Sequence, residues 1–348
     1  MVNDVTAATP DPEHTGDRLP VAVDAMGNDR GPSVVVEGAR IAAETFGTPV
    51  LLVGDPDQLG DVGDLPVSPA SEVVEMGADP AKAVRKLKDS SIVRAAEAVR
   101  DGRASSLLSG GNTGAAMAAS LLRMGRIKGV ARPAIAVPFP VLGSTPSTLL
   151  DCGANAECQP EWLVQFARLG TAYARQRFGL EKPRVGTLTI GEEAGKGNTL
   201  VKAVCELLEQ PEWAAECGAT YVGNVEGGDL MNGAADVIVC DGFTGNVALK
   251  ALEGGMEIFK GALRESFKNA PELEHVAEPI DKAIDPLFKI FDAGATGAAM
   301  LLGTRGVTLI AHGSSSAMVI ANAIRTADEL AAAGIVNHLR ESVGTAPK

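Results

Sequence analysis

A glycine-rich turn with two polar side chains suggests a place where the chain could hold an anion. The stretch LLSGGNTGAAMA, residues 107–118, has the pattern of a strand end, a turn and the first turns of a helix. Gly110 and Gly111 allow the main chain to approach a ligand closely, and Asn112 and Thr113 add side-chain donors. The first N–H groups of a helix lack partners and lie at the positive end of its dipole, so they attract anions. The same residues also suit an ordinary capped turn, and the surrounding sequence has to decide between the two interpretations.

The same succession of apolar strand, polar turn and helix recurs along the chain. It occurs in seven segments rich in Val, Ile and Leu: 21–32, 106–116, 148–157, 185–198, 220–229, 237–246 and 307–316. Nearly continuous apolar strands that alternate with helices predict a mostly parallel sheet with helices on both faces. Ligands of such sheets bind beyond the carboxyl ends of the strands. We therefore expect the seven turns to meet at one edge and to bring together these polar side chains: Asp24, Asn112, Asp151, Asn155, Lys196, Asn224, Asp241, Asn246 and His312.

Several single residues admit a structural as well as a chemical role. Lys196 stands between glycines in GKGN after an apolar strand, which favours an anion contact over a plain surface lysine. His312 ends an apolar strand before GSSS, and both a catalytic and a structural role stay open. Cys152 and Cys240 lie at strand ends, but neither has a His or Lys beside it in sequence to lower the thiol pKa. We interpret both cysteines as packing residues.

The composition is that of an acidic protein with a large core. The 348 residues are 45% hydrophobic and include 40 glycines, which fits many tight turns between strands and helices. The formal net charge of −13 argues against a nucleic-acid-binding surface. The five cysteines have no metal-ligand spacing and suit a reducing cytosol. No apolar run reaches the roughly 18 residues of a membrane span, so we expect a soluble, cytoplasmic protein.

The chain is expected to form a single α/β domain over residues 19–340, preceded by a disordered tail. Residues 1–18 are polar, contain proline and lack the apolar centre of a signal peptide. Residues 161–178 carry apolar side chains at helical spacing, and residues 80–100 predict two short helices. Residues 255–295 lack strand signals, and we interpret them as a helical arm that leaves the sheet.

The order of motifs along the chain gives a family resemblance. The motifs are VAVDAMGNDRGP, SGGNTGAAMA, GRIKGVARPAI, LLDCGAN, PRVGTLTIGEEAGKGN, YVGNVEGGDL, DVIVCDGFTGNVALKALEGG and IAHGSSSAMVIANAI. From about Leu19 to about Leu339 this series resembles the phosphate acyltransferase (PlsX) family of bacterial phospholipid synthesis. The first motif departs from the usual DAMGGDHAP by having Asn28 and Arg30, and Cys152 replaces a usual valine. Arg30 is a candidate to supply a charge in place of the usual histidine.

The resemblance implies transfer of a fatty acyl group from the thioester of acyl carrier protein to inorganic phosphate. The product, acyl phosphate, would serve phosphatidic acid and phospholipid synthesis, with a membrane glycerol-3-phosphate acyltransferase as the enzyme that takes it. The resemblance also implies a fold of the isocitrate and isopropylmalate dehydrogenase type. It further implies a homodimer at the cytoplasmic face of the membrane that needs neither cofactor nor metal.

Phosphate is itself the nucleophile in this reaction, so the protein need only position it, neutralise charge and stabilise the oxyanion. The resemblance gives the expected catalytic residues as Lys196, Asn224, Asp241 and His312. Lys196 is expected to meet phosphate and transition-state charge, and Asp241 and His312 to orient donors or move a proton. The residues expected to bind phosphate and substrate are Asp24, Gly111, Asn112, Thr113, Asn155 and Asn246.

Two further surfaces are expected from local clusters of charged and of apolar residues. The cluster RMGRIKGVAR would guide the acidic carrier protein with its four cations, unless it is merely a solvated loop: Arg123, Arg126, Lys128 and Arg132. In the arm, IDPLFKIFDAG predicts an apolar tip that rests on a lipid surface or packs against a second subunit. The tip residues are Leu287, Phe288, Ile290 and Phe291.

Two other functions compete with acyl transfer. A metal- and NAD-dependent decarboxylating dehydrogenase on a related fold would need an Asp cluster for a divalent ion and an adenosine-binding loop, and we find neither in the sequence. A non-catalytic module would bind phosphate or an acyl group without turning over a thioester.

Overall fold

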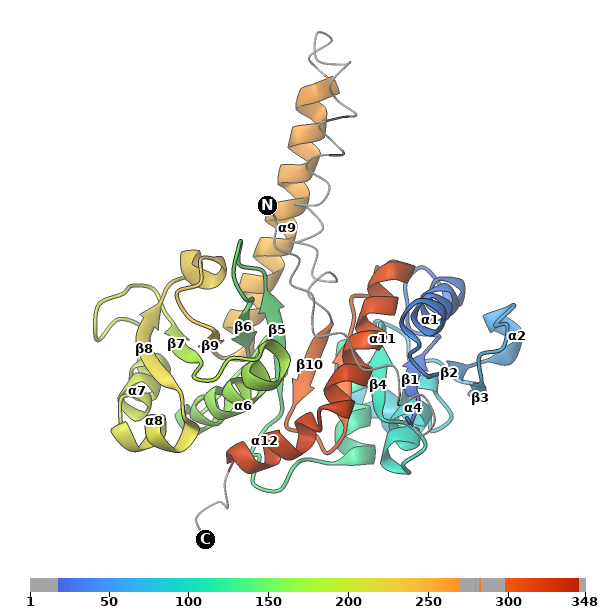
Figure 1. Ribbon diagram of the computed structural model, residues 1–348, viewed down its shortest axis with the longest axis horizontal. Helices are drawn as coiled ribbons and strands as arrows, with labels where there is room; N and C mark the ends of the chain where they lie inside the picture. Colours follow the sequence, from blue (N-terminus) through green and yellow to red (C-terminus); the bar gives the residue numbers. More distant parts are fainter. Residues whose placement is uncertain (1–17, 269–278, 280–281, 283–297, 344–348) are drawn as a thin grey trace.

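The protein is built around one sheet of eleven strands (Figure 1). The computed structural model describes residues 18–268, 279, 282 and 298–343. The strand order is β3-β2-β1-β4-β11-β10-β5-β6-β9-β7-β8. The strands are β1 (Val21–Asp24), β2 (Val50–Gly54), β3 (Val67–Pro69), β4 (Ser106–Ser109), β5 (Ala134–Phe139), β6 (Ser147–Leu150), β7 (Arg184–Leu188), β8 (Thr220–Val225), β9 (Val237–Val239), β10 (Ala299–Leu302) and β11 (Val307–Ile310). All seven predicted strands are present.

Helices cover both faces of the sheet, which confirms the predicted α/β class. The α-helices are α1 (Pro32–Phe46), α2 (Pro56–Leu59), α3 (Pro80–Lys86), α4 (Ser91–Arg100), α5 (Thr113–Ala119), α6 (Pro160–Phe178), α7 (Thr199–Leu208), α8 (Pro211–Cys217), α9 (Gly242–Lys268), α11 (Ala317–Ala332) and α12 (Ile335–Val343). A π-helical turn, Ser120–Met124, continues α5, and a 3-10 turn spans Gly227–Met231. The helix predicted at 161–178 and the two helices predicted within 80–100 are confirmed.

The sheet runs in two opposite directions. Strands β3, β2, β1, β4 and β11 are parallel to one another, and so are β6, β9, β7 and β8. Between these blocks β10 is antiparallel to both neighbours, and β5 is antiparallel to β6. The carboxyl ends of the two blocks therefore point to opposite edges. The expectation that all seven turns meet at one edge is wrong: the turns after β1, β4 and β11 share one edge, and the other four face the opposite way.

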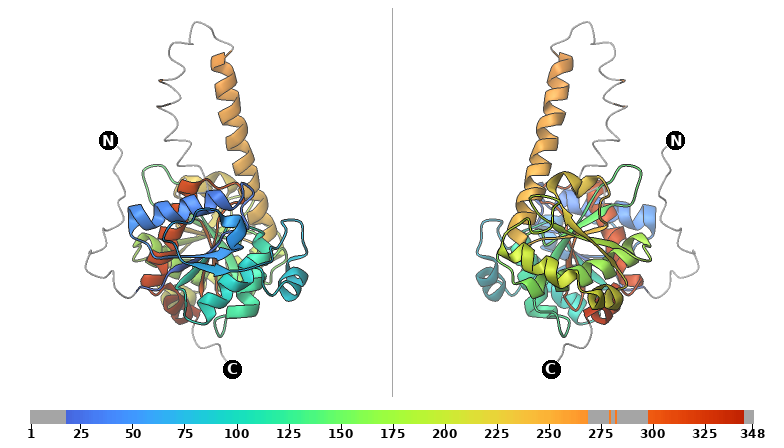
Figure 2. Two further views of the ribbon diagram at one scale, coloured as in Figure 1. Left: turned by 90° about the vertical axis from the view of Figure 1, so that its right-hand side faces the viewer. Right: turned by 90° about the vertical axis from the view of Figure 1, so that its left-hand side faces the viewer.

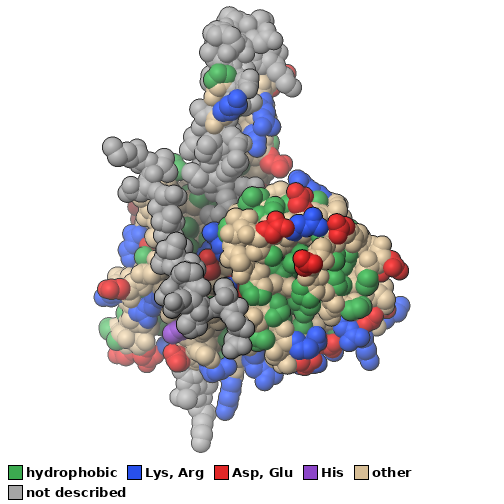
Figure 3. All heavy atoms as spheres, turned by 45° about the vertical axis from the view of Figure 1, so that its right-hand side comes forward, with side chains coloured by type: hydrophobic (Ala, Val, Ile, Leu, Met, Phe, Trp, Pro, Cys, Tyr) green, Lys and Arg blue, Asp and Glu red, His purple; other side chains and the backbone are tan. Residues whose placement is uncertain are grey.

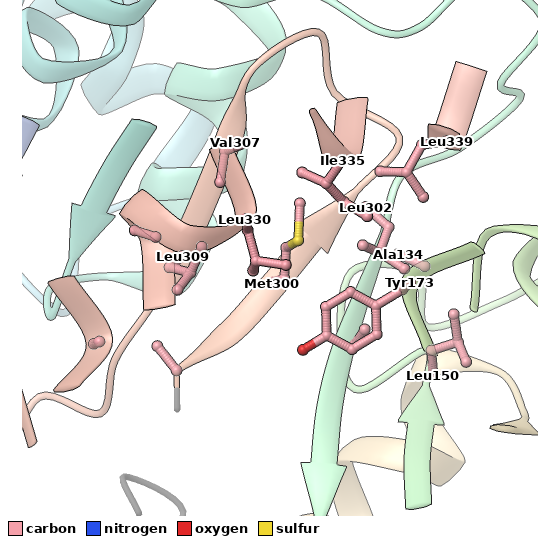
Figure 4. Close-up of a cluster of buried hydrophobic side chains, with 14 of the residues drawn as sticks. Ala134, Leu150, Tyr173, Met300, Leu302, Val307, Leu309, Leu330, Ile335 and Leu339 are labelled. Carbon is pink, nitrogen blue, oxygen red and sulfur yellow. The ribbon is translucent and has the colours of Figure 1, made fainter. Parts of the chain in front are cut away.

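A continuous core joins the two blocks (Figure 4). Leu339 of α12 lies next to Leu302 of β10, and Tyr173 of α6 lies between this pair and Leu150 of β6. These four side chains are at most 1% exposed. Burying a large apolar side chain contributes about 1.5–3 kcal/mol, so this cluster fixes the two blocks relative to each other. One face of the sheet carries α1, α6, α11 and α12, and the other carries α4, α5 and the start of α9.

Helix α9 leaves the body of the protein (Figures 1 and 2). The predicted arm is helical through Lys268 but begins at Gly242, directly after β9, rather than at residue 255. The predicted tip at 287–291 and the predicted tail lie outside the described residues, apart from Arg18 at the end of that tail. Within the described ranges, no helix is both long and apolar enough to cross a membrane.

Candidate functional site

A cavity of about 370 Å³ lies between the two blocks of the sheet. Its floor includes Ile135 and Val137 of β5. The first block supplies the start of α5, with Gly111 and Thr113, and the turn after β11. The second block supplies the turn after β6 and one face of α9. The walls are mostly apolar and the polar groups are few, which is the usual composition of a small-molecule site.

One face of α9 brings two charged residues into the cavity wall. Asn246, Leu249, Lys250 and Glu253 line it at the i, i+3, i+4 and i+7 positions of one helix face. The Lys250 ammonium lies 2.7 Å from Glu253 Oε2. Among the described residues, Lys250 is the single Lys or Arg that lines the cavity. Sequence reasoning missed Lys250 and Glu253, although their spacing from Asn246 would have placed them on its face.

Glycines allow α9 to start close to the turn after β6. A Cβ on Gly242 would lie 2.8 Å from Asp151 Oδ2, and one on Gly245 would collide with the Asp151 carbonyl oxygen. The Asp241 carboxylate caps the helix by accepting from Thr244 N at 2.8 Å. Asp241 therefore anchors α9, and it does not line the cavity.

His312 lines the cavity from the turn after β11. Its Nδ1 accepts a hydrogen bond from the backbone N–H of Ser314 at 3.2 Å and lies 2.8 Å from the Ser314 hydroxyl. A backbone N–H can only donate, so in the neutral ring the proton sits on Nε2. Asp29, which the sequence patterns did not single out, also lines the cavity and lies against Gly313, where a Cβ would overlap its carboxylate.

The glycine-rich turn is held by a buried carboxylate. The Ser109 hydroxyl donates to Asp24 Oδ2 at 2.7 Å and accepts from Gly111 N at 3.1 Å. Burial raises the pKa of Asp24. A Cβ on Gly27 would lie 2.7 Å from the Gly111 Cα, so the turns after β1 and β4 touch only because both residues are glycines. Asp24 thus positions Gly111 without lining the cavity.

Asn112 caps α5 and tethers the preceding loop. Its Oδ1 accepts from Ala115 N at 2.9 Å, and its Nδ2 donates to the Met76 carbonyl at 2.8 Å. The capped-turn interpretation therefore describes Asn112, while Gly111 and Thr113 form the cavity wall.

Asn155 belongs to the framework of the turn after β6. The buried Asp151 carboxylate accepts from Asn155 N at 2.7 Å and from Asn155 Nδ2 at 2.8 Å. Asn155 Nδ2 also donates to the Pro133 carbonyl at 2.8 Å. Burial raises the pKa of Asp151, and the hydrogen bonds oppose that rise. Asn155 holds this turn against the start of β5 and does not line the cavity.

Lys196 and Asn224 lie together, away from the cavity. They flank one loop after β7: Asn224 Nδ2 donates to the Glu193 carbonyl at 2.8 Å, and Lys196 Nζ lies 3.8 Å from Glu193 Oε2. Strands β7 and β8 are the last two strands in the order of the sheet, farthest from β3. The structure therefore brings Gly111, Thr113, Asn246 and His312 together and leaves these two residues apart.

Cys152, which lines the cavity, and Cys240 are unsuited to act as nucleophiles. Burial raises the thiol pKa of Cys152 and of Cys240 well above the ordinary value. The thiolate is the reactive form, so both behave as packing residues, as the sequence predicts. In the part of the chain that the structure describes, no three His, Cys, Asp or Glu residues are grouped to hold a metal ion.

The four cations predicted to dock a carrier protein lie just before β5 in the chain, and none of them lines the cavity. Arg123 belongs to the π-helical turn, and the other three lie in the loop that joins this turn to β5, where Arg126 pairs with Thr304, just after β10. Arg123 Nε lies 3.5 Å from a Glu97 carboxylate oxygen, and the Arg132 guanidinium lies 4.9 Å from the centre of the Trp162 ring. Arg30, proposed as a substitute charge, is exposed and does not line the cavity.

The fold places the chain among α/β proteins built like the phosphotransacetylases. A phosphotransacetylase from Staphylococcus aureus superposes with a TM-score of 0.57 at 16% identity, covering 90% of this chain and 94% of that one. A 4-hydroxythreonine-4-phosphate dehydrogenase from Klebsiella pneumoniae gives 0.53 at 12% identity, with 90% and 100% covered. At these identities the likeness is one of fold alone.

Sequence comparison gives the family. Residues 19–338 match the family described as fatty acid synthesis protein, and the chain belongs to that family. It is 43% identical to the phosphate acyltransferase of Desulforudis audaxviator, over 93% of this chain and 96% of that protein. It is 45% identical to the phosphate acyltransferase of Pelotomaculum thermopropionicum, over 93% and 95%.

Proposed function

We propose that the protein transfers a fatty acyl group to inorganic phosphate in the cavity between the two blocks of the sheet. Full-length similarity to phosphate acyltransferases supports this reaction, and with it a role in phospholipid synthesis. The observation that locates the reaction in this cavity is that its walls are mostly apolar and contain one cation. Lys250 can meet a phosphate dianion, while Ile135, Val137 and Leu249 offer contacts to an acyl chain.

The reaction needs position and charge more than a protein nucleophile. A phosphate oxygen attacks the thioester carbonyl carbon, a C–O bond forms, and the C–S bond breaks as the tetrahedral intermediate collapses. The thiolate leaves readily because an ordinary thiol has a pKa of about 8.5, and it takes up the proton that phosphate loses. Lys250 neutralises the phosphate, and the Nε2–H of His312 donates to the oxyanion. Holding both substrates in line contributes roughly 7–11 kcal/mol in well-oriented cases.

Those residues that were predicted from the sequence but do not line the cavity remain predictions. Lys196, Asn224 and Asp241 are proposed as catalytic, and Asp24, Asn112 and Asn155 as phosphate- or substrate-binding, on the family resemblance. The contacts described above show how the last three and Asp241 also hold their turns. Variants at Lys196 and Lys250 separate the two locations for the cation.

The acyl donor and the assembly belong to the same proposal. We take the donor to be the thioester of acyl carrier protein and the working form to be a homodimer. The acyl phosphate then passes to a membrane glycerol-3-phosphate acyltransferase from a protein that contacts the membrane peripherally. A dimer is supported by apolar side chains exposed along one side of α9, with Phe243, Val247 and Ile258 at 67%, 53% and 75% exposure.

A thiol-release assay distinguishes this function from its rivals. Acyl-carrier thioester and purified protein are mixed with and without inorganic phosphate, and free thiol is measured. Phosphate-dependent thiol release is expected. Release that requires NAD and a divalent metal would support the dehydrogenase, and phosphate binding without any release would support a non-catalytic module. The names of the curated relatives do not favour either alternative.

A further inference from the structure

A short basic helix stands beside the cavity and takes no part in the site described above. Helix α3 and the turn after it carry Lys82, Arg85, Lys86 and Lys88, all exposed. Lys82 pairs with Asp79 at 3.3 Å. For the other three cations, the described residues provide neither an ion pair nor a hydrogen bond. We call Arg85, Lys86 and Lys88 the basic α3 face.

The acidic residues nearest this face in sequence are already engaged. The Asp79 carboxylate caps α3 by accepting from Lys82 N at 3.0 Å. The Asp89 carboxylate accepts from Ser71 Oγ at 2.6 Å and from Arg94 Nε at 2.7 Å. Hydrogen bonds from Ser71 and Arg94 lower the pKa of Asp89 to about 2. These two carboxylates therefore have their own partners, and the basic α3 face keeps its charge.

Helix α3, which carries the basic α3 face, begins next to the cavity wall. Met76, in the loop before α3, lines the cavity and is 50% exposed. Asn112 holds this loop through its hydrogen bond to the Met76 carbonyl. Pro80, the first residue of α3, lies against Gly114 so closely that a Cβ there would meet the proline ring at 2.5 Å. Figure 2 shows the α3 segment standing out on the same side of the body as the base of α9.

The basic α3 face is a local positive patch on a protein whose net charge is negative. The whole chain has a formal charge of −13, and on the face in Figure 3 acidic and basic side chains are interspersed. An acidic partner is therefore repelled by the protein at large. Within a Debye length of about 8–10 Å, three unpaired cations are enough to orient such a partner and raise its association rate. The loop at 123–132 offers fewer free charges, because Arg123 is paired and Arg132 is stacked.

We infer that the basic α3 face docks an acidic carrier protein and so presents its thioester-bound acyl group to the cavity. The inference rests on the proposed function and locates its protein substrate on a surface other than the one the sequence predicts. The loop containing Met76, which lines the cavity, leads directly into α3, so a partner held at α3 is next to the cavity wall. The occupant is a folded acidic protein with its acyl group on a flexible arm.

Charge reversal tests the inference against a matched control. The variant Arg85→Glu/Lys86→Glu changes two exposed residues outside the cavity. The control Arg126→Glu/Lys128→Glu reverses the same number of charges in the loop at 123–132. Binding of a fluorescently labelled carrier protein is followed by anisotropy, and steady-state rates are measured over carrier and phosphate concentration. A thermal midpoint equal to that of the parent protein confirms that each variant folds.

The α3 variant is expected to raise the Kd and the KM for the carrier about tenfold, with kcat at saturating carrier and the KM for phosphate unchanged. Its residual binding should also lose most of its salt dependence. The control should stay within about twofold of the parent. A tenfold loss in the control alone, or no loss in either variant, would overturn the inference. So would loss of binding to vesicles of anionic lipid with carrier binding intact, since the face would then meet a membrane. Carrier binding without phosphate-dependent thiol release would refute the proposed function and leave the docking surface standing.

Discussion

Replacing Lys250 by alanine should lower turnover about 10²–10³-fold, the effect of losing one charge-stabilising group in an active site. A factor of 100 corresponds to about 2.7 kcal/mol of transition-state stabilisation. The structural cost should be much smaller, because the Lys250 side chain is 53% exposed and its ion pair with Glu253 is a surface pair. Such pairs contribute about 0.2–1 kcal/mol to stability. The effects on rate and on stability therefore differ enough to be separated.

The assay is phosphate-dependent thiol release, with a thermal melt of each variant beside it. Lys202→Ala is the matched control, since Lys202 is an exposed lysine of α7 that does not line the cavity. We expect Lys250→Ala to lose kcat/KM for phosphate while its midpoint moves by only a few degrees. A rate within threefold of the parent would refute the role given to Lys250. If Lys196→Ala then lost two orders of magnitude, the reaction would belong to the turns of β7 and β8.

Three further outcomes follow from other parts of the structure. Because the Asp89 pKa is lowered to about 2, its contribution to stability is complete above about pH 4 and is lost as the pH falls toward 2. Asp89→Asn should therefore reduce the change in unfolding free energy between pH 4 and pH 2. An unchanged dependence on pH in this range would contradict the contacts of Asp89 with Ser71 and Arg94. Gly27→Ala places a Cβ 2.7 Å from the Gly111 Cα. The variant should lower the free energy of unfolding in urea by about 1–3 kcal/mol and should also lower kcat. An unchanged free energy of unfolding would show that the two turns can move apart freely. Val247→Glu/Ile258→Glu should convert the proposed dimer to monomers in analytical ultracentrifugation, and an intact dimer would place the subunit contact elsewhere.

Local sequence patterns were sufficient for most elements of the fold. The run Val237–Val239 is apolar because its strand is covered on both faces, and α6 shows its buried face through Leu163, Phe166 and Tyr173. These signals arise from burial of the segment itself. Such patterns can therefore be recognised without knowing which elements pack against the segment.

The direction of the strands could not be obtained in the same way. An apolar run has the same pattern whether it runs up or down the sheet, and β10 is a four-residue strand that follows the arm. It is antiparallel to both of its neighbours, so β5 still runs parallel to the first block. The antiparallel pairing of β5 with β6 then reverses the second block and sends the turn of Lys196 to the edge opposite His312, although both turns follow apolar strands. Lys250 could not be predicted as a site residue because it lies inside a helix, away from any strand end or glycine-rich turn. The packing of α9 against β6 brings it to the cavity.

The most direct test of acyl transfer to phosphate is to identify the product. Purified protein, acyl-carrier thioester and inorganic phosphate are incubated with hydroxylamine, which converts acyl phosphate to acyl hydroxamate. Hydroxamate should form in amounts equal to the thiol released, only when phosphate is present, and with undiminished yield in the presence of a chelator. Release of free fatty acid without hydroxamate, or a requirement for NAD, would contradict the proposed function.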